Sequence, residues 1–257
     1  MRNFGLVLLA FCLLHTEVGA QYGWLGGVKG GITVPKLRAP STERAKYSSG
    51  FESVVGPQFG VVAEFRFSAL FSLQTELNYS SQGGQKNGKQ RIITKDFKAY
   101  IPAGINLPDY LYSNFNNDIS LVYIELPLMA KFSHKISPTY RVSIYGGPYV
   151  GMLIKAEANV DGTSKMFTDP EHTQELTYNG FAVGMVDFTR KEDIIDQLNK
   201  TNYGIQGASS IEYNARNMNC FLALGGTLGL KRLQKDPNFG DNKTGALTIT
   251  LGLTRKL

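Results

Sequence analysis

Histidine and serine are the side chains in this chain that could support hydrolysis. A serine nucleophile needs a histidine held beside it as general base. Beyond the first 20 residues the histidines are His134 and His172, and Ser164 precedes His172 in the same long segment. No predicted strand fixes that segment, His134 falls at a predicted turn, and no phosphate-loop, HExxH or EF-hand motif occurs. We therefore expect no catalytic residue, no cofactor, no metal site and no enzyme activity.

A second set of polar side chains has a regular spacing that could carry ions or relay protons. Its members occupy alternate positions of segments in which apolar and polar residues alternate, so each set lies on one face of a strand. The set is Lys29, Glu64, Arg66, Gln74, Glu76, Glu125, Lys131, Arg141, Lys155 and Glu212.

Eight segments show this alternation strongly enough to predict strands. In the clearest one, residues 71–80, one face is Phe-Leu-Thr-Leu-Tyr and the other is Ser-Gln-Glu-Asn-Ser. At about 10–15 residues each, such strands can cross a bilayer when tilted. The segments are 24–34, 59–67, 71–80, 122–132, 140–154, 203–213, 220–228 and 247–253.

The connections between these strands alternate between long and short. Those at 35–56, 81–118, 158–201 and 231–243 are long, whereas those around Ser68, 133–138 and 214–217 are tight. A transmembrane β-barrel places its short turns in the periplasm and its long loops outside. We therefore predict an all-β fold, an eight-stranded antiparallel up-and-down barrel over residues 21–257. Strand one must pair with strand eight, because lipid tolerates no open sheet edge.

Two prolines and a set of aromatics add detail to the predicted barrel. Pro127 and Pro148 lack a backbone N–H, so we expect local departures from regular pairing beside them. Aromatic side chains cluster near the short-turn end, where barrels in lipid carry an interfacial girdle. These are Trp24, Phe65, Phe67, Phe71, Phe132, Tyr140 and Tyr213.

Composition excludes several classes of protein. Of 257 residues 42% are hydrophobic and 19% charged, with a mean hydropathy of −0.15, so neither a helical membrane protein nor a disordered chain fits. The net charge of +6 is dispersed rather than clustered, which argues against nucleic acid. We expect outer-membrane lipid and lipopolysaccharide as partners, and a monomer.

The first 20 residues are typical of a cleaved export signal. A positive start precedes the apolar stretch 4–14, and small residues at Val18-Gly19-Ala20 predict cleavage between Ala20 and Gln21. Cleavage removes Cys12 and leaves Cys220, so we expect neither an internal disulfide nor a cysteine zinc site.

In a narrow barrel the polar set faces the lumen, where opposite charges must pair. Because an eight-stranded lumen is just wide enough for side chains, we favour a structural role over an ion path or relay. The loops 81–118 and 158–201 are then the contact surface. In the second loop, 174–188 is strand-like and 190–200 has the pattern of a short helix.

Several motifs resemble the PorT-like outer-membrane β-barrel family of Bacteroidota. They are Glu64-Phe65-Arg66-Phe67-Ser68, Leu70-Phe71-Ser72-Leu73-Gln74, Tyr123-Ile124-Glu125-Leu126-Pro127-Leu128, Gly146-Gly147-Pro148-Tyr149 and Leu228-Gly229-Leu230. The resemblance implies a barrel of about eight strands in the outer membrane and, for most members, no defined activity. The founding member is associated with type IX secretion. The chain departs from the family by ending in Arg255-Lys256-Leu257 rather than an aromatic residue.

These observations predict a structural or binding component of the cell envelope that acts through its extracellular loops. A secretion-accessory or small transport barrel is the alternative. An enzyme acting on outer-leaflet lipid ranks third.

Overall fold

The computed structural model describes residues 23–39, 50–94, 107–178, 180–215, 218–237 and 240–257. The predicted export signal, with its junction at Ala20 and Gln21, lies outside these residues. Within the described ranges no helix has the length and apolarity needed to span a bilayer.

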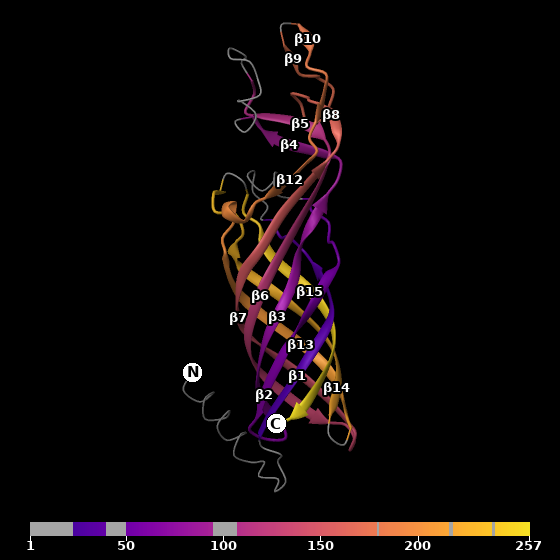
Figure 1. The fold of residues 1–257 in the computed structure, drawn as a ribbon, viewed down its shortest axis with the longest axis vertical. Coiled ribbons are helices and arrows are strands. Elements are labelled where there is room, and N and C mark those ends of the chain that lie inside the picture. Colours follow the sequence, from indigo (N-terminus) through magenta and orange to yellow (C-terminus); the bar gives the residue numbers. More distant parts are fainter. Residues whose placement is uncertain (1–22, 40–49, 95–106, 179, 216–217, 238–239) are drawn as a thin grey trace, which may run out of the picture.

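Eight long strands form a closed antiparallel ring in which sequence neighbours pair (Figure 1). The ring closes between β1 and β15, whose register runs from Leu25 opposite Lys256 to Pro35 opposite Ala246. The predicted eight-stranded up-and-down barrel is therefore confirmed. Its strands are β1 (Gly23–Pro35), β2 (Gly56–Arg66), β3 (Phe71–Lys86), β6 (Asn116–Lys135), β7 (Tyr140–Asp161), β13 (Thr201–Asn214), β14 (Asn219–Arg232) and β15 (Lys243–Lys256).

Serine side chains shape two of the short turns at one end of the barrel. The Ser68 hydroxyl accepts hydrogen bonds from the backbone N–H groups of Leu70 (3.2 Å) and Phe71 (2.9 Å). Ser137 does the same for the N–H of Tyr140 (3.0 Å). These local bonds satisfy backbone donors where no ladder partner exists, so each hairpin can reverse within a few residues.

The alternation predicted from sequence is inverted relative to a soluble protein. Along β3 the polar side chains from Ser72 to Gln82 are buried, while Leu73 and Leu77 are exposed. An apolar outer belt around a polar interior is the arrangement of a barrel in lipid.

Pairing is interrupted beside both prolines, as predicted. Between β6 and β7, Pro127 lies opposite Tyr149 and Ala130 opposite Gly146, with no paired residues between them and no change of register. Pro148 lies within this gap. The true bulge is elsewhere, between Val122 and Tyr123, where the register shifts by one residue.

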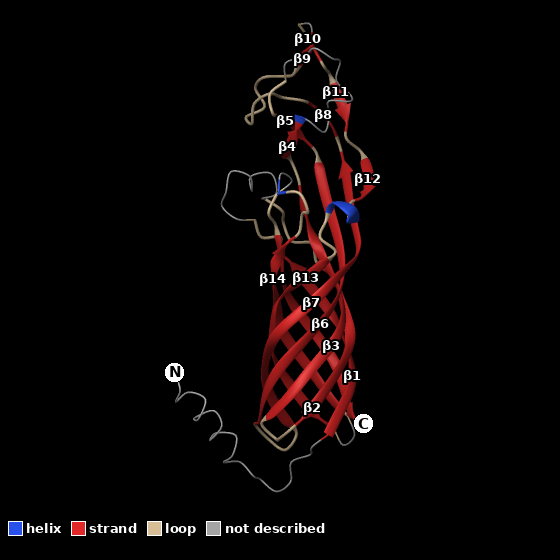
Figure 2. Ribbon diagram, turned by 90° about the vertical axis from the view of Figure 1, so that its left-hand side faces the viewer, coloured by secondary structure: helices blue, strands red, loops and turns tan. Residues whose placement is uncertain are grey.

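Strands β3, β6 and β7 continue beyond the barrel at the end with the long loops (Figure 2). They carry a further layer of short strands that we call the head. It consists of β4 (Lys89–Ile93), β5 (Tyr110–Asn114), β8 (Thr163–Lys165), β9 (Thr177–Tyr178), β10 (Phe181–Ala182) and β11 (Met185–Asp187). Three two-stranded pairs form there, β4 with β5, β8 with β11, and β9 with β10. The strand-like pattern at 174–188 therefore marks real strands.

The predicted helix at 190–200 is wrong. Arg190–Asp193 forms strand β12, which pairs with β7, and only Ile195–Gln197 forms a single 3-10 turn, η3. The Asp193 carboxylate accepts the N–H of Ile195 at 2.9 Å, which favours the turn. Pairing with the long edge of β7 satisfies more backbone groups than one isolated helical turn could, so tertiary context overrides the local pattern.

Candidate functional site

Four charged side chains from three strands, β2, β6 and β13, form a closed cluster in the lumen near the short-turn end. Arg66 Nε lies 2.6 Å from Glu64 Oε1, and Lys131 Nζ lies 2.9 Å from Glu64 Oε2. Lys131 also reaches Glu212 Oε1 at 2.6 Å, and Arg66 reaches Glu212 Oε2 at 3.5 Å. Each carboxylate thus faces two cations. All four are buried, so the cluster compensates charge that would be costly if unpaired.

A second cluster is centred on Glu76, nearer the middle of the barrel. Its carboxylate lies 2.5 Å from Lys29 Nζ and accepts hydrogen bonds from the side-chain amides of Gln74 (2.7 Å) and Asn78 (2.9 Å). Gln206 on β13 contributes a longer bond of 3.5 Å. The carboxylate therefore links β1, β3 and β13 across the lumen.

Glu125 occupies the lumen on the loop side and is completely buried. Gln82 donates to its Oε1 at 2.7 Å, while its Oε2 has no hydrogen-bond partner among the described residues. Asn78 on β3 lies directly opposite it in register.

Nine of the ten predicted lumen residues are buried inside the barrel: Lys29, Glu64, Arg66, Gln74, Glu76, Glu125, Lys131, Arg141 and Glu212. Their structural role stays a prediction. The assignment of Lys155 to the lumen is wrong, because its side chain is 54% exposed and pairs with Glu157 at 2.9 Å. The bulge between Val122 and Tyr123 shifts the register there, so that Ile154 and Lys155 both point outward. Alternation alone does not reveal a bulge.

An apolar cluster, which we call the plug, fills the mouth of the barrel above Glu125. Tyr123 and Leu121 are almost fully buried and face inward from β6, and Leu198 and Leu233 fold in from the loops. An ion leaving the lumen on this side would meet a layer in which the Tyr123 hydroxyl is the polar side-chain group and the other members are aliphatic. The plug was missed in the sequence, although the buried run Leu121-Val122-Tyr123 breaks the alternation and was the available signal. Its members are Leu37, Leu121, Tyr123, Leu153, Ala156, Leu198 and Leu233.

Aromatic side chains form a partial belt on the outer surface at the short-turn end. Ring centroids lie 5.1 Å apart between Trp24 and Phe65, and 4.8 Å between Phe65 and Phe67. The series continues through Phe71 to Phe132, with spacings of 5.6 and 5.3 Å. On the next strands Tyr140 and Tyr213 are 5.4 Å apart. The predicted girdle residues therefore lie on β1, β2, β3, β6, β7 and β13, with Phe67 in the turn between β2 and β3.

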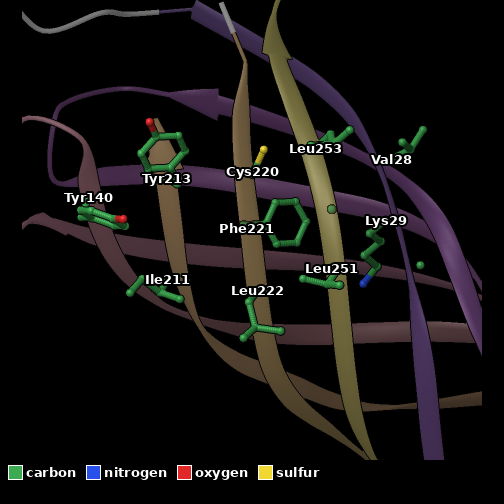
Figure 3. A pocket seen from close by; sticks show the side chains of 12 residues that line it. Val28, Lys29, Tyr140, Ile211, Tyr213, Cys220, Phe221, Leu222, Leu251 and Leu253 are labelled. Carbon is green, nitrogen blue, oxygen red and sulfur yellow. The ribbon is translucent and has the colours of Figure 1, made fainter. Parts of the chain in front are cut away.

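A shallow hollow of about 570 Å³ lies in the barrel wall among β1, β13, β14 and β15. Figure 3 shows its mostly apolar lining, which includes Ile211, Leu222 and Leu251. Lys29 also lines it, but its ammonium is engaged by Glu76. With that charge paired, the hollow offers no arrangement of polar groups for a specific ligand, and we regard it as part of the lipid-facing surface.

The head has a hydrophobic core of its own. Leu111 on β5 is fully buried, and Ile92, Val160, Met166, Leu176 and Phe188 complete the cluster. Phe115 stacks on Phe188 with ring centroids 5.0 Å apart. These residues come from both long loops and from the extension of β7, so the two predicted contact loops fold together into one unit.

The side chains considered for hydrolysis are not arranged for it. The Ser164 hydroxyl donates to the Lys165 carbonyl oxygen and accepts the N–H of Asn114. His172 stacks on Phe167 with ring centroids 4.6 Å apart, and no hydrogen bond joins it to Ser164 in the described ranges. His134 is exposed at the other end of the barrel. In the same ranges no group of three His, Cys, Asp or Glu side chains is placed to hold a metal ion.

Comparison with known proteins agrees with the barrel geometry. The model of the family described as outer membrane protein beta-barrel domain matches residues 20–235. No curated protein sequence matches the chain.

Among solved structures, the chain is similar to Neisserial surface protein A, with 12% identity, coverage of 90% of this chain and 97% of that one, and a TM-score of 0.41. It is also similar to Ail, the attachment invasion locus protein of Yersinia pestis, with 9% identity, coverage of 90% and 99%, and a TM-score of 0.39. For the outer membrane protease OmpT from Escherichia coli the identity is 9%, the coverage 94% and 99%, and the TM-score 0.46. Likenesses this distant carry no argument about activity. The family match covers most of the chain, and with it we conclude that this protein belongs to the outer membrane protein beta-barrel domain family.

Proposed function

We propose that this protein is a closed, non-catalytic barrel whose head serves as a binding surface outside the cell. The observation that carries the proposal is the head's own hydrophobic core around Leu111, held away from the membrane on the extensions of β6 and β7. A loop that merely connects two strands does not need a buried core. Binding residues are typically displayed on such segments by a rigid scaffold.

The interior supports a structural rather than a transport role. Lys131 and Arg66 are each shared between two carboxylates, and the plug lies between the lumen and the loop end. A transport barrel would need a continuous polar path. The secretion-accessory reading remains the alternative, because it also uses the head as a contact surface.

Localisation and origin complete the proposal. Membership of the family supports the outer membrane, with the short turns in the periplasm and the head outside. We propose export through a signal cleaved between Ala20 and Gln21, a monomer surrounded by lipid and lipopolysaccharide, and a place in the PorT-like group of Bacteroidota.

Replacing residues 163–189, which carry β8, β9, β10 and β11, by a short Gly-Ser linker tests the role of this part of the head. We expect the variant to reach the outer membrane and keep heat-modifiable gel migration, while ligands captured by the intact protein from native membranes or from the medium are lost. Unchanged capture by the linker variant would refute the head as the binding surface. Secretion components that co-purify with both forms would favour the accessory role instead.

A further inference from the structure

The outermost hairpin of the head exposes apolar side chains without any charge among them. Residues 176–186 read Leu-Thr-Tyr-Asn-Gly-Phe-Ala-Val-Gly-Met-Val, between Glu175 and Asp187. Phe181 is 79% exposed and Met185 62%, with Val183 and Tyr178 less so. We call these four side chains the tip. Strands β9 and β10 lie at the end of the molecule farthest from the short turns (Figure 1).

The tip is presented by an ordered base. Leu176 is buried in the head core, and its N–H donates to the Met166 carbonyl oxygen at 2.8 Å. The Val183 N–H in turn donates to the Leu176 carbonyl oxygen at 3.0 Å. Gly180 and Gly184 have positive φ angles of 81° and 84°, which suit glycine in tight turns. The hairpin is thus anchored at its base while its apolar side chains project outward.

Nothing in the described head covers this surface. A methyl group added at Gly180 or Gly184 would meet no atom within 4 Å. Exposed apolar side chains gathered at one point, with polar residues behind them, mark a site that another apolar phase covers.

The size and shape of the tip favour a lipid bilayer over a protein as that phase. The four side chains expose a few hundred Å², whereas a stable protein interface needs about 800 Å² from each partner. The tip also lies on a hairpin that projects at the end of the molecule (Figure 1), and a projecting apolar group needs a matching pocket on a protein but none in fluid lipid. Phe and Tyr are the residue types that settle at membrane interfaces.

We propose that the tip inserts into the outer leaflet of a membrane facing the cell. The inference rests on the proposed function, because it requires the head to lie outside. The protein's own membrane surrounds the barrel belt, which the extended strands separate from the tip (Figure 2). The carboxylates that flank the hairpin are Glu175, which pairs with Lys165 at 2.9 Å, and Asp187, which accepts the N–H of Thr189 at 2.9 Å, and a carboxylate does not attract anionic lipid. Insertion is therefore apolar and does not depend on anionic lipid.

A tryptophan moved to the tip provides the direct test. The chain has a single Trp, at Trp24 near the short turns, so the variant W24F/F181W reports only on the hairpin. With the barrel held in a nanodisc, vesicles of phosphatidylcholine are added. We expect a blue shift of the emission, and quenching by brominated acyl chains that is equal in 50 and 500 mM NaCl. Emission unchanged by vesicles would overturn the proposal, and insertion that salt abolishes would mean electrostatic adsorption instead.

Paired substitutions separate the tip from general exposure. Phe181→Asp should lower co-flotation of the nanodisc-held protein with vesicles at least tenfold, because a side chain that enters the vesicle bilayer is exchanged for a charged one. Val54→Asp, an exposed apolar position away from the tip, should leave it unchanged. Equal behaviour of the two variants would overturn the proposal. If insertion fails while the 163–189 linker variant still loses ligand capture, only this inference fails. If the linker variant captures ligands as before, the proposed function fails as well.

Discussion

Replacing Glu76 by alanine should destabilise the barrel strongly without opening it. The Glu76 side chain is 1% exposed and lies 2.5 Å from the ammonium of Lys29, which is itself 6% exposed. Removal of one partner from a buried ion pair costs about 3–5 kcal/mol, because the remaining charge is left uncompensated. At about 2–4 °C per kcal/mol for a chain of this size, the unfolding midpoint should fall by roughly 6–20 °C. The amides of Gln74 and Asn78 lose their acceptor in the same step.

Two measurements test this prediction. The first is the temperature at which the barrel in detergent loses its fast gel migration, and the second is single-channel recording in planar bilayers. Glu157→Ala is the matched control, because Glu157 pairs with Lys155 at the surface and should leave the midpoint unchanged. The double variant Lys29→Met/Glu76→Met should recover most of the loss, since it leaves no lone charge. A Glu76→Ala midpoint equal to that of the control, or a defined conductance that this change alone removes, would refute the structural role of the cluster.

Three further predictions concern the head and the belt. Leu111→Ala should lower the stability of the head core by about 2–5 kcal/mol and make the loops protease-sensitive, while the fast gel migration of the barrel persists. Loss of protease resistance and of fast migration together would show that the head and barrel unfold together. Burial acts to raise the pKa of Asp169, but hydrogen bonds from the backbone N–H groups of Thr173 and Gln174 and from the Thr173 hydroxyl outweigh it and lower the pKa. The ionised carboxylate therefore stabilises its turn fully at a pH above the unfolded-state pKa of about 3.9, and this stabilisation is lost as the pH falls through the lowered pKa of the folded state. Carboxyl NMR titration and amide exchange would detect the loss, and Asp169→Asn is the pH-independent control. Trp24 fluorescence in the barrel's own bilayer should be quenched by lipids brominated near the headgroup more than by those brominated at the chain end, and the reverse order would move the aromatic belt away from the interface.

The barrel was predictable from sequence because its constraint is local and repeated. In lipid every second side chain must be apolar and every backbone group paired, so segments such as 71–80 carry an uninterrupted period of two. The same rule placed Glu76 and Glu125 inside. The rule failed at Lys155. The bulge between Val122 and Tyr123 turns the Lys155 side chain from the lumen to the outer surface, and no characteristic residue type marks the bulge in the sequence.

The sequence by itself determined the strand number, the order of long and short connections, and which face of nearly every strand is apolar, because these follow from periodicity along the chain. Only the tertiary structure decided which lumen charges pair, since Glu64 meets Lys131 and Glu212 meets Arg66 through contacts between distant strands. It also decided that the two long loops share one core and that 190–193 pairs with β7 instead of forming a helix. The plug and the head depend on apolar residues brought together from separate loops, and no spacing within a single segment records such contacts.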